Sequence, residues 1–223
     1  FHDQVVTRLT LEKLAILEAS GARVVFVQTF DAAFAALSPE TFFDRFLVQG
    51  LRAQSVHVGF NFRFGKDRLG DTGTLGALCD RAKIALTVAP PVSLGGTQVS
   101  SSAIRRLISE GDTAKAAEWL GRPFSVTGQV AHGDHRGSKL GFPTANVTYP
   151  DDKVLPKNGV YVSRAIWQRQ GFRAVTNVGV RPTITSEASS KPRIEVHILD
   201  FNSRLYDEIL EVEFLERLRD ERK

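Results

Sequence analysis

The sequence contains no methionine, one cysteine and no long hydrophobic run. The single cysteine, Cys79, excludes an internal disulfide framework and favours a reducing compartment, so the cytoplasm is the expected location. No apolar run approaches the ~20 residues that a bilayer-spanning helix needs, and the chain does not open with a signal-peptide pattern. We therefore expect neither a disulfide-rich secreted domain nor a membrane partner.

The absence of methionine extends to the first position, because the chain begins with Phe1. Average residue usage would place several methionines in a chain of this length. We therefore expect further residues to precede Phe1 in the full protein.

Blocks of like charge are also absent. The chain has 29 Lys and Arg against 25 Asp and Glu, which gives a net charge of +4 and a pI of about 9.4. A nucleic-acid-binding protein usually concentrates its basic residues on one face. The scattered charge suits a small anionic ligand such as a nucleotide, although an ordinary mixed surface explains it more simply. We expect no nucleic-acid partner, and the oligomeric state stays open.

The first 120 residues alternate helical and strand patterns. Leucines recur at helical spacing from Leu11 to Leu17, and Ser38 with Pro39 is typical of a helix start with an apolar face of phenylalanines. Apolar runs predict strands, and the run at 24–27 has the pattern of a strand buried on both faces. Such alternation predicts a parallel sheet covered by helices. The expected strands are 24–27, 55–59 and 84–89, with a helix at 75–82.

The pattern changes near Arg122. Asp112 can cap a short helix that runs to Leu120, and the segments that follow are strands separated by turn signals. This half is typical of an antiparallel barrel or sandwich, so we place a domain boundary between residues 1–121 and 122–223. The expected strands are 124–130, 160–166, 172–178, 193–199 and 209–214.

A glycine-rich loop in the second half has the chemistry of a phosphate site. Gly133 and Gly137 let the backbone turn tightly, and successive N–H groups in such a turn form an anion-binding nest. Arg136 and Lys139 add positive charge for phosphate oxygens. Glycine loops also connect strands for structural reasons alone, so this pattern leaves both interpretations open.

Three oxygen-bearing side chains extend this pattern. Thr144 and Asn146 share one face if they lie on a strand, and their neutral oxygens suit Mg²⁺ whose other ligands are phosphates and water. Glu195 lies in a run with the pattern of a strand, and its side chain is expected on the face opposite to that of Ile194 and Val196. It is a candidate general base for a hydroxyl nucleophile. An ordinary turn and a solvated strand face are the structural alternatives.

Several motifs of the second half resemble riboflavin kinases, in the order seen in that family. They resemble the C-terminal module of the bacterial bifunctional riboflavin kinase/FAD synthetase over essentially all of residues 122–223. The motifs are the loop from Gly128, Gly141–Asn146, Asn158–Tyr161, Thr176–Thr183 and Glu195–His197.

This resemblance implies a six-stranded antiparallel barrel that transfers the γ-phosphate of ATP to the ribityl 5′-hydroxyl of riboflavin. It implies that Thr144 and Asn146 hold Mg²⁺, that Glu195 is the base, and that the loop from Gly133 to Lys139 covers ATP. By the same resemblance, Asn177 and Arg181 lie near the flavin.

The second half also departs from the family. Ser138 stands where many members carry an arginine, so one phosphate contact is expected either to be lost or to be taken over by Lys139. The chain ends at Lys223, before the C-terminal helix that the family packs beside the flavin.

The first half resembles the adenylyltransferase module of the same family, a Rossmann-type nucleotidylyltransferase that joins FMN to the AMP part of ATP and releases pyrophosphate. The resemblance places Asn61 and Phe62 near the flavin or adenine, and Ser101, Ser102 and Arg105 at the ATP phosphates. A loop that buries its phenylalanines and a plain helix N-cap are the structural alternatives.

The family's opening signature, a Gly-x-Phe-Asp-Gly-x-His-x-Gly-His loop, is not in the sequence. We attribute the gap to residues upstream of Phe1, and we expect the chain as printed to adenylylate FMN poorly or not at all.

The prediction is therefore a two-domain enzyme that uses ATP and Mg²⁺ to convert riboflavin to FMN and FMN to FAD. A kinase with a degenerate first domain, a nucleotide- or RNA-binding protein with a basic barrel, and a flavin-binding sensor are the alternatives.

Overall fold

The computed structural model describes residues 8–131, 144–180 and 191–221. The chain forms two compact units, one of Phe1–Arg23 with Val99–Lys223 and the other of Val24–Gln98. The predicted domain boundary lies between residues 121 and 122, inside the first of these units, and it stays a prediction. Among the described residues, none of the helices is both long and apolar enough to cross a bilayer.

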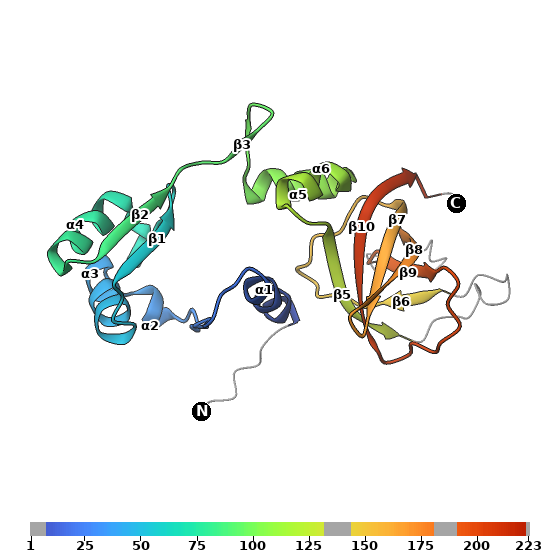
Figure 1. The fold of residues 1–223 in the computed structure, drawn as a ribbon, viewed down its shortest axis with the longest axis horizontal. Coiled ribbons are helices and arrows are strands. Elements are labelled where there is room, and N and C mark those ends of the chain that lie inside the picture. Colours follow the sequence, from blue (N-terminus) through green and yellow to red (C-terminus); the bar gives the residue numbers. More distant parts are fainter. Residues whose placement is uncertain (1–7, 132–143, 181–190, 222–223) are drawn as a thin grey trace. The chain divides into compact units, whose positions relative to one another are not determined.

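The first unit is built on a closed barrel of six strands (Figure 1). Each strand pairs antiparallel with its neighbours, in the order β10-β5-β6-β9-β8-β7. This confirms the predicted six-stranded antiparallel barrel. The strands are β5 (Phe124–Ala131), β6 (Ala145–Val147), β7 (Gly159–Trp167), β8 (Gln170–Gly179), β9 (Arg193–Ile198) and β10 (Ile209–Arg219).

The barrel interior follows from alternation along these strands. In β9, Ile194, Val196 and Ile198 are buried while the residues between them are partly exposed, as the sequence pattern predicted. Aromatic rings fill one part of the interior, where Tyr161 meets Phe214 edge-on at 5.4 Å between ring centroids. Burial of these apolar side chains is the main force that stabilises the barrel.

Two short helices pack on the barrel. They are α5 (Ser101–Glu110) and α6 (Thr113–Leu120). Asp112 caps α6 as predicted, because its side chain accepts a hydrogen bond from the Lys115 N–H, and Ser100 caps α5 by accepting one from the Ala103 N–H. In α6 the buried Thr113 hydroxyl donates to the carbonyl of Leu215 on β10 at 3.3 Å.

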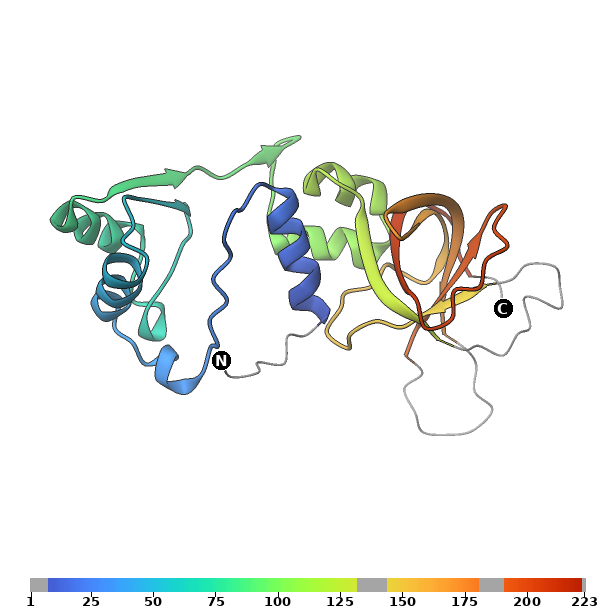
Figure 2. The ribbon, with the colours of Figure 1, turned by 60° about the horizontal axis from the view of Figure 1, so that its bottom comes forward.

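A further helix, α1 (Arg8–Ala19), lies beside β5 (Figure 2). Glu12 accepts the backbone N–H of Thr127 at 2.9 Å and forms an ion pair with Lys153 at 2.5 Å. Both charged side chains are only 11% exposed. Each charge has lost most of its contact with water, and the attraction between the two offsets that loss. This contact fixes the register of α1 on the barrel.

The second unit has the predicted parallel sheet. Strands β1 (Ser55–Gly59) and β2 (Ala85–Ala89) pair in parallel, and α4 (Thr72–Ala82) connects them, as expected for an α/β nucleotidylyltransferase-like fold. Its core includes Phe43, Leu75 and the free thiol Cys79. The remaining elements are α2 (Ala32–Ala35), α3 (Pro39–Phe42), the π-helix η1 (Phe43–Gly50), the 3₁₀ helix η2 (Lys66–Arg68), and the hairpin β3 (Ser93–Leu94) with β4 (Thr97–Gln98).

The strand predicted at 24–27 was wrong. These residues form no strand in the structure, and Val24 and Phe26 are 86% and 65% exposed. The sheet of this unit consists, in the described chain, of β1 and β2 alone. An apolar run becomes a strand only where a neighbour takes up its backbone hydrogen bonds, and here no described neighbour does so.

Candidate active site

Three polar side chains form a row on the outer surface of the barrel. Glu195 on β9 lies directly opposite Asn146 on β6 and directly opposite Asn177 on β8. Directly opposed residues have Cβ atoms about 5 Å apart, so both carboxamides lie beside the carboxylate. All three residues are partly exposed, because their strand neighbours occupy the barrel interior. The row brings together the predicted base, one predicted metal ligand and one predicted flavin contact.

The Glu195 carboxylate is free to act on a ligand. Within the described ranges it forms neither a side-chain hydrogen bond nor an ion pair. A partly exposed carboxylate without a fixed partner can accept a proton from a bound hydroxyl. The row therefore has the chemistry of a general base flanked by two carboxamides.

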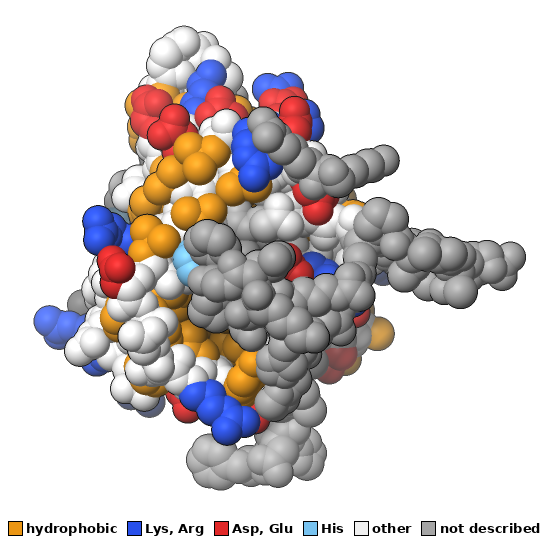
Figure 3. Space-filling model, turned by 90° about the vertical axis from the view of Figure 1, so that its right-hand side faces the viewer, with side chains coloured by type: hydrophobic (Ala, Val, Ile, Leu, Met, Phe, Trp, Pro, Cys, Tyr) orange, Lys and Arg blue, Asp and Glu red, His pale blue; other side chains and the backbone are white. Residues whose placement is uncertain are grey.

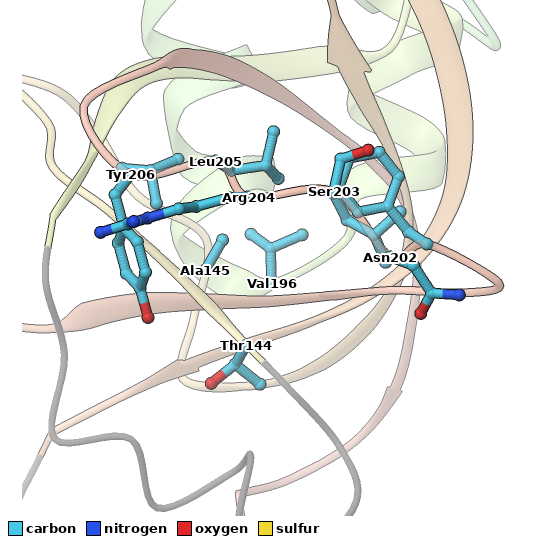
Figure 4. Close-up of a pocket in the computed structure, with 11 residues that line it drawn as sticks. Thr144, Ala145, Val196, Asn202, Ser203, Arg204, Leu205 and Tyr206 are labelled. Carbon is cyan, nitrogen blue, oxygen red and sulfur yellow. The ribbon is translucent and has the colours of Figure 1, made fainter.

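Thr144 lies just before β6 and is exposed. It stands at the rim of a pocket of about 270 Å³ at the mouth of the barrel. Ala145 and Val196 form the floor of this pocket, and the segment between β9 and β10 forms its far wall (Figure 4). The described residues that line it are Val130, Thr144, Ala145, Val196, Ile198, Phe201, Asn202, Ser203, Arg204, Leu205 and Tyr206.

The wall segment combines an apolar anchor with a positive charge. Leu205 is buried and fixes the segment to the barrel, whereas Arg204 is exposed. The Arg204 guanidinium lies over the ring of Tyr206, 5.3 Å from its centroid. Figure 4 shows the Arg204 side chain extending across the pocket toward Tyr206. The pocket is thus apolar inside and carries a cation at its edge.

The end of the β6–β9 pairing is reinforced by side chains. The Tyr149 hydroxyl donates to the carbonyl of Pro192, a residue whose nitrogen carries no hydrogen to continue the ladder. Lys191 Nζ donates to the Tyr149 carbonyl at 3.2 Å and to Asp151 at 2.5 Å. Burial, aided by the Asp151 charge, raises the pKa of Tyr149, and Lys191 lowers the pKa of Asp151. These bonds hold the strands that carry Asn146 and Glu195.

Five predicted kinase residues lie outside the described residues. They are Gly133, Arg136, Gly137 and Lys139 of the glycine loop, and Arg181. Their predicted roles toward ATP and the flavin stay predictions.

The predicted adenylyltransferase residues lie in two different units. Asn61 is exposed after the end of β1, and Phe62 is half-buried and stacked on Phe64 at 5.5 Å between centroids. Ser101 and Ser102 are exposed in the first turn of α5, and Arg105 is exposed one turn later; these three belong to the barrel unit. Their exposure leaves the α5 N-terminus accessible to a ligand.

One face of the molecule is mixed in character. Figure 3 shows hydrophobic side chains gathered on the side of the barrel unit that faces right in Figure 1, bordered by acidic and basic side chains. Such a surface suits a ligand that has both an apolar ring and charged groups.

Sequence reasoning missed the wall of the pocket. Arg204 and Tyr206 had no assigned role, although the polar segment Asn202–Arg204 lies in the loop that follows the strand of Glu195. A polar loop after a strand that carries a candidate base was the available signal.

Comparisons with known proteins agree with this geometry. The riboflavin kinase family matches residues 120–223, and the FAD synthetase family matches residues 3–103. A bifunctional riboflavin kinase/FMN adenylyltransferase of Pseudomonas fluorescens is 38% identical over 97% of this chain and 69% of its own length. The Bacillus subtilis protein of the same name is 35% identical over 95% of this chain, and the chain spans 66% of it.

A solved structure is also similar. A crystal structure described as a macrolide-efflux protein from Streptococcus pneumoniae has a TM-score of 0.83 and 33% identity, and the match covers 96% of this chain and 67% of that one. Both halves of the chain thus match the two enzyme modules in order. The chain belongs to the family of bifunctional riboflavin kinases/FMN adenylyltransferases.

Proposed function

We propose that the barrel transfers the γ-phosphoryl group of ATP to the primary hydroxyl of riboflavin, and that the preceding module transfers the AMP group of ATP to the FMN so formed. The observation that carries the kinase proposal is the row of Asn146, Glu195 and Asn177 beside a pocket at the barrel mouth. This row places a candidate base beside two carboxamide groups that can orient the reactants. The proposed modules are residues 1–121 and 122–223.

In the kinase step, the hydroxyl oxygen of riboflavin attacks the γ-phosphorus while the bond from that phosphorus to the β,γ-bridging oxygen breaks. ADP leaves, and the hydroxyl proton passes to a carboxylate oxygen of Glu195. The step needs positioning more than covalent catalysis, because phosphoryl transfer has a loose transition state. Asn177, directly opposite Glu195, can hold the flavin side chain by hydrogen bonds. Arg181 is proposed to contact the same ligand.

Magnesium is the proposed metal, and Thr144 and Asn146 are its proposed ligands. The donor set fits, since a hydroxyl and a carboxamide oxygen are hard neutral ligands. The described residues contain no cluster of three or more His, Cys, Asp or Glu that could hold the ion, and we propose that its remaining ligands are nucleotide oxygens and water. When bound, the ion neutralises charge on the phosphates.

The pocket at the barrel mouth is the proposed place for the ATP base. Its floor is apolar, its volume of about 270 Å³ suits a planar ring, and Thr144 stands at its rim. A base in this pocket directs the phosphates toward Thr144 and the Glu195 row. The glycine loop with Gly133, Arg136, Gly137 and Lys139 is proposed to cover those phosphates.

In the adenylyltransferase module, Ser101, Ser102 and Arg105 are the proposed phosphate contacts, because a helix N-terminus with free hydroxyls favours an anion. Asn61 and Phe62 are the proposed flavin or adenine contacts. The proposed location is the cytoplasm, where a buried free thiol such as Cys79 stays reduced.

The substitution Glu195→Gln tests the proposal. It keeps the size and hydrogen-bonding capacity of the side chain but removes its basicity, so FMN formation should slow by ~10²–10⁴ with riboflavin affinity nearly intact. Glu216→Gln is the matched control, because Glu216 is exposed on β10, which does not pair with β9. Equal turnover of the two variants would remove Glu195 from the mechanism.

A further inference from the structure

The carboxylate of Glu221 lies directly against the end of β8. A Cβ added to Gly179, the last residue of that strand, would overlap Glu221 Oε1 and lie only 2.7 Å from Oε2. Gly179 faces the outside of the barrel, because the preceding Val178 is buried in its interior. Gly179 is nevertheless buried, since the carboxylate occupies the space that a side chain would fill. Glycine at this position therefore leaves room for Glu221 on the strand.

The residue before Glu221 is held in place by the barrel. Arg217 Nη2 donates to the carbonyl of Asn158 at 2.7 Å and to the carboxylate of Asp220 at 2.6 Å. One guanidinium thus ties Asp220 to the segment that enters β7. This restricts where the next residue, Glu221, can place its side chain.

The position that Glu221 fills is next to the row of Asn146, Glu195 and Asn177. Gly179 lies two residues after Asn177 on the same face of β8, and Asn177 is directly opposite Glu195. Gly179 is thus a diagonal neighbour of Glu195, and such neighbours are about 7–8 Å apart. Glu221 therefore places a second carboxylate close to the candidate base.

The Glu221 carboxylate is available to a ligand. It is partly exposed, and within the described ranges it forms neither a side-chain hydrogen bond nor an ion pair. Arg193 is directly opposite Gly179 on β9, yet among these residues no ion pair joins it to Glu221. An ionised carboxylate only accepts hydrogen bonds, so it favours a ligand with hydroxyl groups and repels one with negative charge.

We propose that Glu221 is a riboflavin-binding residue of the kinase site, which accepts hydrogen bonds from secondary hydroxyls of the ribityl chain and disfavours FMN. This inference rests on the proposed kinase function. With the primary hydroxyl at Glu195 and the chain held by Asn177, the secondary hydroxyls lie within reach of Glu221. After transfer, the phosphate of FMN lies near the same carboxylate and is repelled by it. Glu221 thus selects the substrate over the product.

The test is the kinetics of Glu221→Gln in the full chain. The KM for riboflavin should rise about fivefold, because a charged acceptor becomes a neutral one. The inhibition constant of FMN should stay within about twofold, because the loss of repulsion offsets the loss of the same hydrogen bonds. The ratio of the FMN inhibition constant to the riboflavin KM should therefore fall about fivefold. A site that is merely loosened would weaken both ligands alike and leave this ratio unchanged.

Three further variants separate a ligand contact from a structural role. Glu216→Gln removes an exposed carboxylate earlier on β10 and should not change the ratio. Arg193→Gln should not lower the ratio, whereas it would do so if Glu221 served only to pair with Arg193. Gly179→Ala should lower the ratio as Glu221→Gln does, because its methyl group displaces the carboxylate. If Gly179→Ala does not fold, Glu221→Gln decides the question.

Flavin-fluorescence titration distinguishes failure of this inference from failure of the kinase proposal. If wild-type protein forms no FMN, the kinase proposal fails, and titration with riboflavin and with FMN then tests Glu221 alone. A fall in the preference for riboflavin in Glu221→Gln, but not in Glu216→Gln, supports the contact. An unchanged preference in Glu221→Gln, an equal fall in Glu216→Gln or Arg193→Gln, or a wild type that does not bind riboflavin would overturn it.

Discussion

The substitution Gly128→Ala should damage the kinase barrel specifically. Gly128 is buried on β5, where β6 approaches so closely that an added Cβ would lie 1.6 Å from the carbonyl oxygen of Thr148 and 2.6 Å from a methyl carbon of Val147. Ordinary contacts of a Cβ begin at 3.4 Å, so β6 has to move away from β5.

The size of the effect follows from the bonds that such a movement breaks. Thr148 and Gln129 share three hydrogen bonds, of 2.9 Å, 3.2 Å and 3.1 Å, beside Gly128. At about 1 kcal/mol each, their loss lowers the free energy of unfolding by about 3 kcal/mol. The displaced strand carries Asn146, so FMN formation should fall as well.

Denaturant unfolding followed by tryptophan fluorescence measures this effect, because both tryptophans, Trp119 and Trp167, lie in the barrel unit. Gly171→Ala is the matched control, since its added Cβ would meet only the flexible Arg164 side chain, at 3.1 Å, and should change stability by less than about 0.5 kcal/mol. A Gly128→Ala protein that unfolds at the wild-type midpoint would refute the close-approach argument.

Three further predictions concern the metal, a turn and an acid-sensitive ion pair. Asn146→Ala should raise the Mg²⁺ concentration for half-maximal kinase rate severalfold, since one oxygen ligand is lost; an unaltered titration would argue against ligation. Arg169→Gly should raise the free energy of unfolding by about 0.5–1 kcal/mol, because Arg169 (φ +65°) and Gln168 (φ +49°) form the β7–β8 turn in a left-handed conformation that glycine adopts freely; a lower midpoint in denaturant would contradict this. Lys191 lowers the pKa of Asp151 below its ordinary 3.8, so the pair stabilises the fold above that pH and the contribution is lost as the pH falls through the folded-state value. Asp151→Asn should therefore flatten the loss of stability on acidification below about pH 4, and parallel acid-unfolding curves would contradict it.

Local patterns predicted much of the barrel unit. The alternation of Ile194, Val196 and Ile198 fixed both the strand and its buried face, and Asp112 marked a helix start that the structure confirms. The barrel closure came from the resemblance to riboflavin kinases, because periodicity alone left a barrel and a sandwich open. The same resemblance predicted the family, which the comparisons confirm.

The failures have a common cause in tertiary context. The run at 24–27 has the composition of a buried strand, but its burial depends on neighbouring strands that a local pattern does not contain. The pocket of Arg204 and Tyr206 is formed by residues of β5, β6, β9 and the β9–β10 segment. These segments are far apart in the sequence, so no local pattern predicts that they line one pocket. The register that sets Asn146 and Asn177 on either side of Glu195 likewise depends on strand pairing across the barrel.

The most direct test of the kinase assignment is to incubate the protein with riboflavin, ATP and Mg²⁺ and to separate the flavins by chromatography. The account predicts that riboflavin is converted to FMN, with ADP formed in equal amount. Riboflavin that binds to the protein but remains unconverted would contradict it.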